Sequence, residues 1–468
     1  MSIVLSNILE NLPKEDTTNY RVLNKTLFQQ NEKVCIIIDD DPTGNQTVYD
    51  VPLLTTWNLE VFISEFINKT PVFFVLTNSR SLSASETSKI YQEVAENIAK
   101  ASKLTQQDFV LISRSDSTLR GHFPLEPVTL NSFAKIGNSM TVFIPVMFEG
   151  GRVTVNDVHY VSDLKKLTPV SETPFAQDHS FAYTKSDLKE YIEEKTKGEI
   201  EAACVYSFSI ATIRSESVET LSNQILNIPL NTYCIFNSLT YQDLDKVTNA
   251  LLLAEKAGKK IVYRTSSSFV PSYIGLKPKN ILESKNLIKQ SNTNGGLTIV
   301  GSYVKKSSEQ LKNALALFNE DCIIEVDANR IITDSLNSYK KELVEHINKK
   351  ISNGKDVIVF TSRVLITGTD KDSTIKIAST ISKSLVYLVN NISITPRYLI
   401  AKGGITSHDI ATKGLGMIRS RVLGQLLPGI PVWEMGEETR FPRLPYVVFP
   451  GNVGDVNSLS TIIKKLSN

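Results

Sequence analysis

The sequence contains few cysteines and no long hydrophobic run. Its four cysteines, Cys35, Cys204, Cys234 and Cys322, are far apart, and each lies in an apolar, strand-like stretch. This distribution favours buried, reduced thiols over a disulfide framework or a zinc site, and it predicts a cytoplasmic protein. No stretch reaches about 18 consecutive apolar residues, and the amino-terminal residues lack a basic region followed by an apolar one. We therefore expect neither a membrane span nor export.

The chain also has little net charge and lacks several standard motifs. It carries 51 basic and 49 acidic residues, a net charge of +2, with no concentrated basic block, so nucleic acid is not an expected partner. The glycine patterns of dinucleotide-binding folds and of Walker-type nucleotidases are missing from the strand–helix contexts where they would be expected. The G-x-S-x-G elbow of α/β-hydrolases is missing as well. These absences disfavour three common classes of α/β enzyme.

What the sequence does contain is a series of apolar runs that end in polar clusters. Four such runs in the first half predict buried strands of a parallel sheet: 34–38, 72–76, 109–112 and 141–145. Residues 83–101 have helical spacing and predict a crossover helix between the second and third of these strands. Right-handed crossovers bring the ends of successive strands to one edge of a sheet, so the polar clusters should converge there.

The length of the chain predicts two domains, because 468 residues are too many for one ordinary core. A charged helix is expected at 185–197, and three further apolar runs should complete the first sheet: 202–206, 232–236 and 260–263. The composition then shifts, after Thr265-Ser266-Ser267-Ser268, to a stretch with Pro and Gly and to polar residues that end near 296. We expect a first domain at 1–275, a linker region at 276–296 and a second domain at 297–468.

The second half repeats the strand pattern with small residues in place of acids. Its apolar runs lie at 297–300, 356–360, 398–401 and 446–449. Gly and Ser or Thr at a strand–helix junction expose backbone N–H groups that bind phosphate, although a plain tight turn would explain Gly403-Gly404-x-Thr406 about as well. The sequence thus predicts an α/β protein of two domains, each a largely parallel sheet with flanking helices.

The candidate site residues of the first half are acids and arginines. Asp39, Asp40 and Asp41 follow the first strand, and Asp116 follows the third. A solvated acidic turn is the alternative for the first group. Strand ends also carry the arginines Arg80, Arg114, Arg120 and Arg152. Arginine binds a small carboxylate through two parallel hydrogen bonds, but these arginines could instead only neutralise the aspartates. His159 is a candidate acid or base, with a structural role as the alternative.

Five motifs together resemble those of the four-carbon acid sugar kinase family. They are Asp39 to Gly44, Ser113 to Gly121, Glu149 to Arg152, Gly403 to Ser407 and Pro450 to Gly454, in the family's order from about residue 33 to 456. The resemblance implies an amino-terminal domain that binds a sugar acid and a carboxyl-terminal domain that binds ATP, with the active site in the cleft between them. It implies a phosphotransferase with an alcohol group as acceptor, which phosphorylates a terminal hydroxyl of a tetronate or 3-oxo-tetronate type acid in carbohydrate catabolism.

The resemblance also implies site residues. The family's D-D-x-T-G falls on Asp40, Asp41, Thr43 and Gly44, its D-S-T-L-R-G falls on Asp116 to Gly121, and the nucleotide elements fall on Ser302, Gly403, Gly404, Ile405, Thr406 and Gly451. Val304 and Ile405 depart from the family, which often has Ser and an acidic residue there. These departures suggest a subgroup whose substrate is not a simple tetronate.

The expected mechanism assigns Asp40 or Asp41 as the base, with Asp116 as the competing candidate. Asp39, Thr43, the four arginines and His159 are predicted to bind the substrate. Mg²⁺ is expected to arrive with ATP, although the sequence contains no dedicated metal cage. The expected partners are the sugar acid and ATP, with a homodimer as a candidate assembly. A nicotinamide-dependent sugar-acid oxidoreductase and a non-catalytic sensor of a sugar acid and a nucleotide remain the alternative functions.

Overall fold

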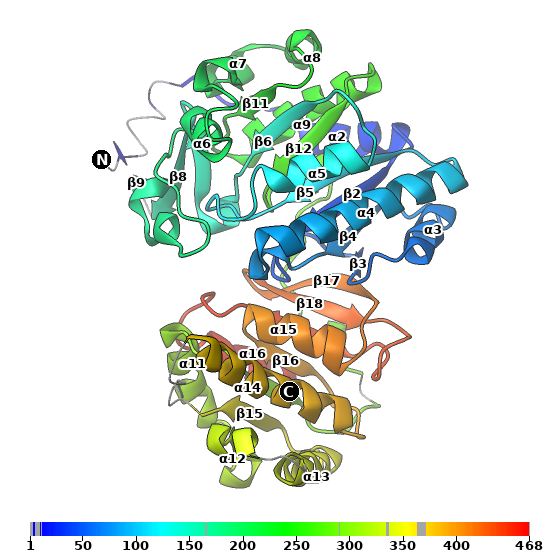
Figure 1. Ribbon diagram of the computed structural model, residues 1–468, viewed down its shortest axis with the longest axis vertical. Coiled ribbons are helices and arrows are strands. Elements are labelled where there is room, and N and C mark those ends of the chain that lie inside the picture. The colour runs from blue at the N-terminus through cyan, green and yellow to red at the C-terminus, as the bar shows by residue number, and fades with distance from the viewer. Residues whose placement is uncertain are drawn as a thin grey trace. The chain divides into compact units, whose positions relative to one another are not determined.

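The computed structural model contains two compact α/β units (Figure 1). It describes residues 3–4, 10, 12–163, 166–289, 291–333, 337–362 and 371–467. The first unit comprises residues 1–48 and 56–278, and the second comprises 49–55 and 279–468. The predicted organisation as a two-domain α/β protein with largely parallel sheets and flanking helices is confirmed. No helix of the described residues is long and apolar enough to cross a membrane.

The central sheet of the first unit is parallel throughout. Its strand order is β10-β11-β6-β12-β5-β2-β4. The strands are β2 (Val34–Asp39), β4 (Val72–Leu76), β5 (Phe109–Arg114), β6 (Met140–Ile144), β10 (Tyr206–Phe208), β11 (Tyr233–Phe236) and β12 (Ile261–Thr265). Every residue of β2 is buried because helices cover both faces of the sheet. All the strands therefore end at one edge, where the polar clusters follow them.

Helices cover this sheet on both faces. They are α2 (Tyr20–Gln30), α3 (Leu59–Ile67), α4 (Ala84–Thr105), α5 (Leu125–Phe133), α6 (Leu188–Lys195), α7 (Ile210–Ser215), α8 (Val218–Asn227), α9 (Tyr241–Lys256) and α10 (Phe269–Tyr273). The expected crossover helix is α4, which begins at a capping box between Ser83 and Glu86. In Figure 1, α4 and α5 lie on the side of the sheet turned toward the viewer. The β11–α9–β12 connection runs in the opposite direction along the sheet, which places α9 on the other face.

A small antiparallel sheet adjoins the strand ends of the first unit. It has the order β1-β9-β8-β7, with β1 (Ile3–Val4), β7 (Arg152–Val155), β8 (Val158–Asp163) and β9 (Lys166–Pro169). Two short 3₁₀ segments follow it, η3 (Val170–Glu172) and η4 (Pro174–Gln177). Val170 and Ala176 anchor these segments in a buried cluster that includes Tyr183 and Tyr191. The sequence analysis did not predict this sheet.

The second unit has a mixed sheet, and three turns of small residues follow strands of its parallel part. Its order is β3-β17-β18-β19-β16-β13-β15-β14. The strands are β3 (Val51–Leu54), β13 (Leu297–Val300), β14 (Ile323–Val326), β15 (Val357–Thr361), β16 (Leu399–Lys402), β17 (Arg419–Leu427), β18 (Ile430–Met435) and β19 (Pro445–Phe449). The helices are α11 (Lys305–Leu315), α12 (Ala328–Thr333), α13 (Ser338–Ser352), α14 (Lys371–Asn391), α15 (Gly404–Asp409) and α16 (Ser458–Ser467).

The units differ from the predicted domain boundaries at two places. Residues 49–55 belong to the second unit because β3 pairs antiparallel with β17, Val51 opposite Val422. Residues 279–296 do not form a separate linker, because Leu282 donates its backbone N–H to the Gln425 carbonyl and packs in the core of the second unit. The chain therefore passes between the units three times.

The prediction for residues 202–206 was also wrong. Residues Ala202–Cys204 form a 3₁₀ turn, and the strand starts only at Tyr206. Cys204 is consequently exposed, whereas the other three cysteines are buried free thiols as expected. The short alanine-rich run was apolar enough to suggest a strand, but its first residues close a turn from Glu201 instead.

Candidate active site

The acidic loop after β2 is held by two arginines from neighbouring strand ends. Arg114, the last residue of β5, places Nη1 2.9 Å from Asp39 Oδ1 and 3.4 Å from Asp40 Oδ1. Arg80, which follows β4, places Nη2 2.6 Å from Asp40 Oδ1 and Nη1 3.1 Å from Asp41 Oδ2. Asp39 and Asp40 are fully buried, while Asp41 is partly accessible. The structure thus brings together five of the residues that the sequence singled out.

Two motif glycines are required by the close packing of this loop. A Cβ on Gly44 would collide with the Asp39 carboxylate and the Arg114 guanidinium. Gly121 has φ +126°, and a Cβ there would lie 3.3 Å from Asp40 Oδ2. Both glycines therefore allow the backbone to close over the buried carboxylates.

Asp39, Asp41 and Asp116 have shifted pKa values, and the shifts differ in direction. Burial raises the pKa of Asp39 to about 7, although Arg114 opposes the shift. Burial also raises the pKa of Asp41, but Arg80 and the hydrogen bonds from Thr43 outweigh it and leave the pKa below its usual value. For Asp116, Arg80 and Arg120 likewise outweigh burial and hold the pKa low. Asp41 and Asp116 are therefore anionic at neutral pH, whereas Asp39 titrates near neutrality.

The loop that follows β5 joins the same cluster. Asp116 Oδ2 accepts from Arg120 Nε at 2.7 Å, and Arg80 Nη1 lies 3.8 Å from Asp116 Oδ1. Two buried tyrosines hold the backbone of this loop. The Tyr183 hydroxyl donates to the Thr118 carbonyl and the Tyr191 hydroxyl to the Leu119 carbonyl, each at 2.7 Å. The loop is thereby positioned by side chains that are distant in sequence.

Arg152 differs from the other three arginines of the cluster. No carboxylate of the described residues lies within ion-pair distance of it, and its Nη1 donates only to the Gly150 carbonyl. Within the described part of the chain, its buried Nε has no hydrogen-bond partner. Burial lowers the pKa of Arg152, and the positive charge of Arg120 adds to this effect while Asp116 opposes it. Arg152 therefore has no carboxylate of the described chain within ion-pair distance, and only the more distant Asp116 favours its positive charge.

His159 contacts the loop that follows β5. It is fully buried; its Nδ1 accepts from the Thr154 hydroxyl at 2.9 Å and its Nε2 donates to the Ser117 carbonyl at 2.7 Å. Burial lowers its pKa to about 4, so the ring is neutral at pH 7. Because both ring nitrogens are occupied, this geometry argues against the predicted contact with substrate and indicates support of the loop that contains Ser117.

Two residues of the site were missed by the sequence analysis. Glu126 is buried and accepts from the hydroxyls of Ser79 at 3.1 Å and Ser115 at 2.9 Å; burial and the charge of Asp40 raise its pKa. Ser267 accepts from Arg114 Nη2 at 2.8 Å and donates to the Gly44 carbonyl at 3.2 Å. Ser267 follows β12 in a polar cluster like those that follow the other strands. The sequence therefore pointed to Ser267, but we interpreted this cluster only as a sign of the domain boundary.

In the second unit, the turns after β13, β16 and β19 are neighbours. Val300 pairs with Lys402, and Lys402 pairs with Phe449, so the three strands end in register. A Cβ on Gly403 would lie 3.0 Å from Thr406 Oγ1 and 3.1 Å from Ser302 Cβ, and one on Gly451 would lie 3.0 Å from Ser302 Oγ. The structure therefore brings Ser302, Gly403, Thr406 and Gly451 together.

The remaining residues of these turns differ in exposure. The space around Gly404 is open. Ile405, at the position where the family often has an acidic residue, is 60% exposed. Lys402, which the sequence analysis did not assign, is fully buried; its Nζ donates to the Pro450 carbonyl at 3.0 Å and lies 3.8 Å from the centre of the Phe449 ring. Lys402 thus links the second and third turns.

The donor set of these turns fits phosphate better than a metal held by protein alone. The candidate residues of these turns, Ser302, Gly403, Gly404, Thr406 and Gly451, provide glycine backbone and hydroxyl groups and no carboxylate. Over the part of the chain that the structure describes, no group of three or more His, Cys, Asp or Glu side chains could hold a metal ion.

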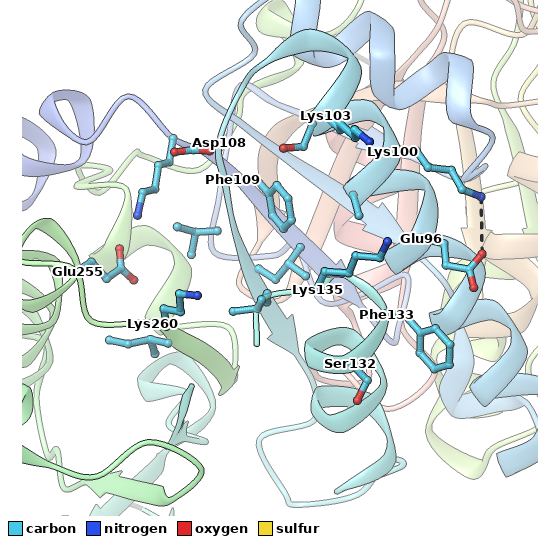
Figure 2. Close-up of a pocket in the computed structure, with 18 of the residues that line it drawn as sticks. Glu96, Lys100, Lys103, Asp108, Phe109, Ser132, Phe133, Lys135, Glu255 and Lys260 are labelled. Carbon is cyan, nitrogen blue, oxygen red and sulfur yellow. Dashed lines mark ion pairs between the residues drawn. The ribbon is translucent and has the colours of Figure 1, made fainter. Parts of the chain in front are cut away.

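A cavity of about 910 Å³ lies at the opposite edge of the first unit's sheet, where β5 and β12 begin. Figure 2 shows Lys103, Lys135 and Lys260 around it, together with an ion pair of 3.6 Å between Lys100 and Glu96. None of the predicted site residues lines this cavity. The carboxyl-terminal edge remains the candidate active site, because ligands of open α/β sheets bind there.

Two family models match this chain. The model described as "Sugar-binding N-terminal domain" matches residues 35–273, and the model described as "Nucleotide-binding C-terminal domain" matches residues 297–459. The first model covers every candidate residue of the first unit, and the second covers those of the second unit. No curated protein matches the chain.

Solved structures share the fold at low sequence identity. A Haemophilus influenzae protein of family DUF1537 has a TM-score of 0.64 at 16% identity, covering 92% of this chain and 100% of that one. A structure named as the putative tRNA synthase of Salmonella typhimurium LT2 has a TM-score of 0.67 at 15% identity, covering 92% of this chain and 98% of that one. These structures share the fold with this chain. The two domain matches fit the four-carbon acid sugar kinase family, and the chain belongs to the family that joins a sugar-binding N-terminal domain to a nucleotide-binding C-terminal domain.

Proposed function

We propose that the protein is an ATP-dependent kinase that phosphorylates the terminal hydroxyl of a small sugar acid of the tetronate or 3-oxo-tetronate type. The observation that carries this proposal is the cluster of aspartates and arginines at the strand ends of the sugar-binding domain. A hydroxy acid needs a cation for its carboxylate and a carboxylate to accept the proton of its reacting hydroxyl. The cluster contains both, and a nucleotide-binding domain follows it in the chain.

Asp41 is the best candidate for the base. Asp40 is fully buried and receives hydrogen bonds from Arg80 Nε, Arg80 Nη2 and Arg114 Nη1, so its oxygens are occupied by arginine. Asp41 keeps 22% of its side chain exposed and has one arginine partner. A low pKa suits this role, because the proton leaves late in a loose phosphoryl-transfer transition state and positioning matters more than basicity. Asp116, with 12% of its side chain exposed, is the second candidate.

The three neighbouring turns of the second unit are the proposed site for the phosphates of ATP. The backbone of Gly403, Gly404 and Ile405 and the hydroxyl of Thr406 would bind phosphate oxygens, with Ser302 and Gly451 beside them. Mg²⁺ would be bound by the phosphates and by water, and it would neutralise charge on the transferred group. Lys402 keeps the turns in place through the Pro450 carbonyl.

The test is a screen of four-carbon sugar acids, with and without a 3-oxo group, for ADP formation from ATP. We expect ATP-dependent phosphorylation of at least one acid, with the phosphate on the terminal carbon by NMR. Thermal shift measurements with ATP analogues and with NAD and NADP distinguish the alternatives. Stabilisation by nicotinamide cofactors alone would indicate an oxidoreductase, and binding of acid and nucleotide without ADP formation would indicate a sensor.

A further inference from the structure

We propose that the segment from Phe175 to Asp178 is a specificity element that builds a carboxylate receptor from Arg152 and Arg120. This inference rests on the proposed function, and it names the group of the substrate that the receptor recognises. The segment belongs to η4 and the residue after it. Neither the motifs nor the domain matches assign a role to any of its residues.

The first argument is the distribution of charge in the cluster. Arg80 and Arg114 are matched by Asp39, Asp40 and Asp41 within 3.4 Å, so neither has a free charge to offer a ligand. The other two arginines of the cluster are less fully paired with carboxylates. Arg120 shares Asp116 through Nε, and Arg152 has no carboxylate partner among the described residues. The least compensated charge of the cluster therefore lies on Arg152, with the terminal nitrogens of Arg120 near it.

The second argument is that one aromatic ring contacts both guanidinium groups. The Arg120 guanidinium carbon lies 5.1 Å from the centre of the Phe175 ring, and that of Arg152 lies 5.6 Å from it. The negative face of an aromatic ring attracts cations, so Phe175 can hold two like charges near each other. Val170 and Ala176 fix the ring's segment in a buried cluster. Phe175 therefore sets the spacing of the two arginines.

The third argument is the behaviour of Asp178. Its Oδ1 accepts from the backbone N–H groups of Ser180 and Phe181, which fixes the side chain, and its Oδ2 lies 3.6 Å from Arg120 Nη1. That distance is longer than the ~2.8 Å of a charge-assisted hydrogen bond. Asp178 thus stands near Arg120 as a weak internal carboxylate, and a substrate carboxylate bound to Arg152 can compete with it for Arg120.

The receptor implies a substrate with a carboxylate and excludes a neutral sugar or polyol of the same length. Burial makes the charge of Arg152 costly in the free protein, and a ligand carboxylate would remove that cost. A polyol offers no negative charge to Arg152. Selection between an acid and its polyol analogue is therefore expected to depend on Arg152, while ATP binding is not.

The test measures kcat and KM for the best acid and for the matching polyol, together with acid binding by calorimetry. Arg152→Gln should raise KM for the acid about 10- to 100-fold and leave KM for ATP unchanged, with partial recovery in Arg152→Lys. Phe175→Leu keeps the apolar bulk but loses the ring face, and it should raise KM for the acid about 2- to 5-fold. Asp178→Asn should lower KM for the acid. Phe181→Leu is the matched control, because Phe181 lies three residues beyond the segment and its ring contacts His122 instead of an arginine.

The outcomes separate the receptor from the proposed function. If the wild type phosphorylates an acid and Arg152→Gln leaves its KM unchanged, the receptor is wrong and the kinase assignment stands. If the wild type binds acids without phosphorylating them and Arg152→Gln abolishes binding, the receptor stands and the kinase assignment fails. A Phe175→Leu effect no larger than that of Phe181→Leu would remove Phe175 from the receptor. Unchanged selection between acid and polyol in Arg152→Gln would also overturn it.

Discussion

Replacing Asp41 and Asp40 separately with asparagine distinguishes the base from the residue that supports it. A general base contributes about 10²- to 10⁴-fold in rate, so Asp41→Asn should lower kcat at least about 100-fold, a barrier increase of ~2.7 kcal/mol. Its effect on folding should be small, about 1 kcal/mol or less, because Asp41 is partly exposed and has one arginine partner at 3.1 Å.

The same substitution at Asp40 should mainly affect stability. Asp40 is fully buried and accepts three hydrogen bonds from Arg80 and Arg114, and an asparagine would leave donors of both arginines facing an amide. Breaking a buried ion pair costs about 3–5 kcal/mol, and we expect the lower end because each arginine keeps another aspartate.

Coupled ADP assays and urea unfolding of both variants at one pH provide the comparison. If Asp41→Asn keeps kcat within about tenfold of the wild type, a change of only ~1.4 kcal/mol in barrier, Asp41 is not the base. Asp116→Asn would then be the next variant to measure. Equal losses of stability in the Asp40 and Asp41 variants would contradict the assignment of Asp40 as the buried partner of both arginines.

Three further predictions follow from the geometry of the two units. The pKa of Asp39 is raised to about 7 in the folded protein, so its contribution to stability is fully present below about pH 4 and is lost as the pH rises through 7; urea unfolding across this range should show a decline that is flatter in Asp39→Asn. Gly44→Ala should lower the free energy of unfolding by about 2 kcal/mol or more, because its Cβ meets Asp39 and Arg114; chemical denaturation of Gly404→Ala, whose Cβ would meet no atom and whose φ is not positive either, controls for adding a methyl group at a glycine. Gly403→Ala should raise KM for ATP without changing calorimetric binding of the acid, and an unchanged KM would remove this turn from the nucleotide site.

The strands of the parallel sheets could be predicted because their signal is local. The run Val34–Asp39 is apolar until its last residue, and the structure buries every residue of it. The loop that follows could be predicted for the same reason, because Asp40 and Asp41 come directly after the run. Parallel topology then brought loops from different strands to one edge, as the crossover argument expected.

The partners of these loops could not be predicted, because they depend on contacts between distant segments. Phe175 lies in a stretch without periodicity, and only the folded chain brings its ring to Arg120 and Arg152. The individual roles of the arginines could not be predicted for the same reason. Arg114 ends β5 and Arg152 begins β7, yet Arg114 has two carboxylates within 3.4 Å and Arg152 has none of the described residues within ion-pair distance.

The pairing of β3 with β17 has a consequence for how the protein is made. Val51 leaves the ribosome long before Val422, its partner in the sheet, so β3 is synthesised with its pairing edge unsatisfied. The second unit can complete its sheet only by recruiting this early strand, which gives it contacts of very long sequence separation and predicts slow folding of that sheet. A chain cut at residue 278 would retain β3 without its partner β17, and a chain that begins at residue 279 would lack β3. Expressed separately, the two halves should therefore be prone to associate through β3 and β17.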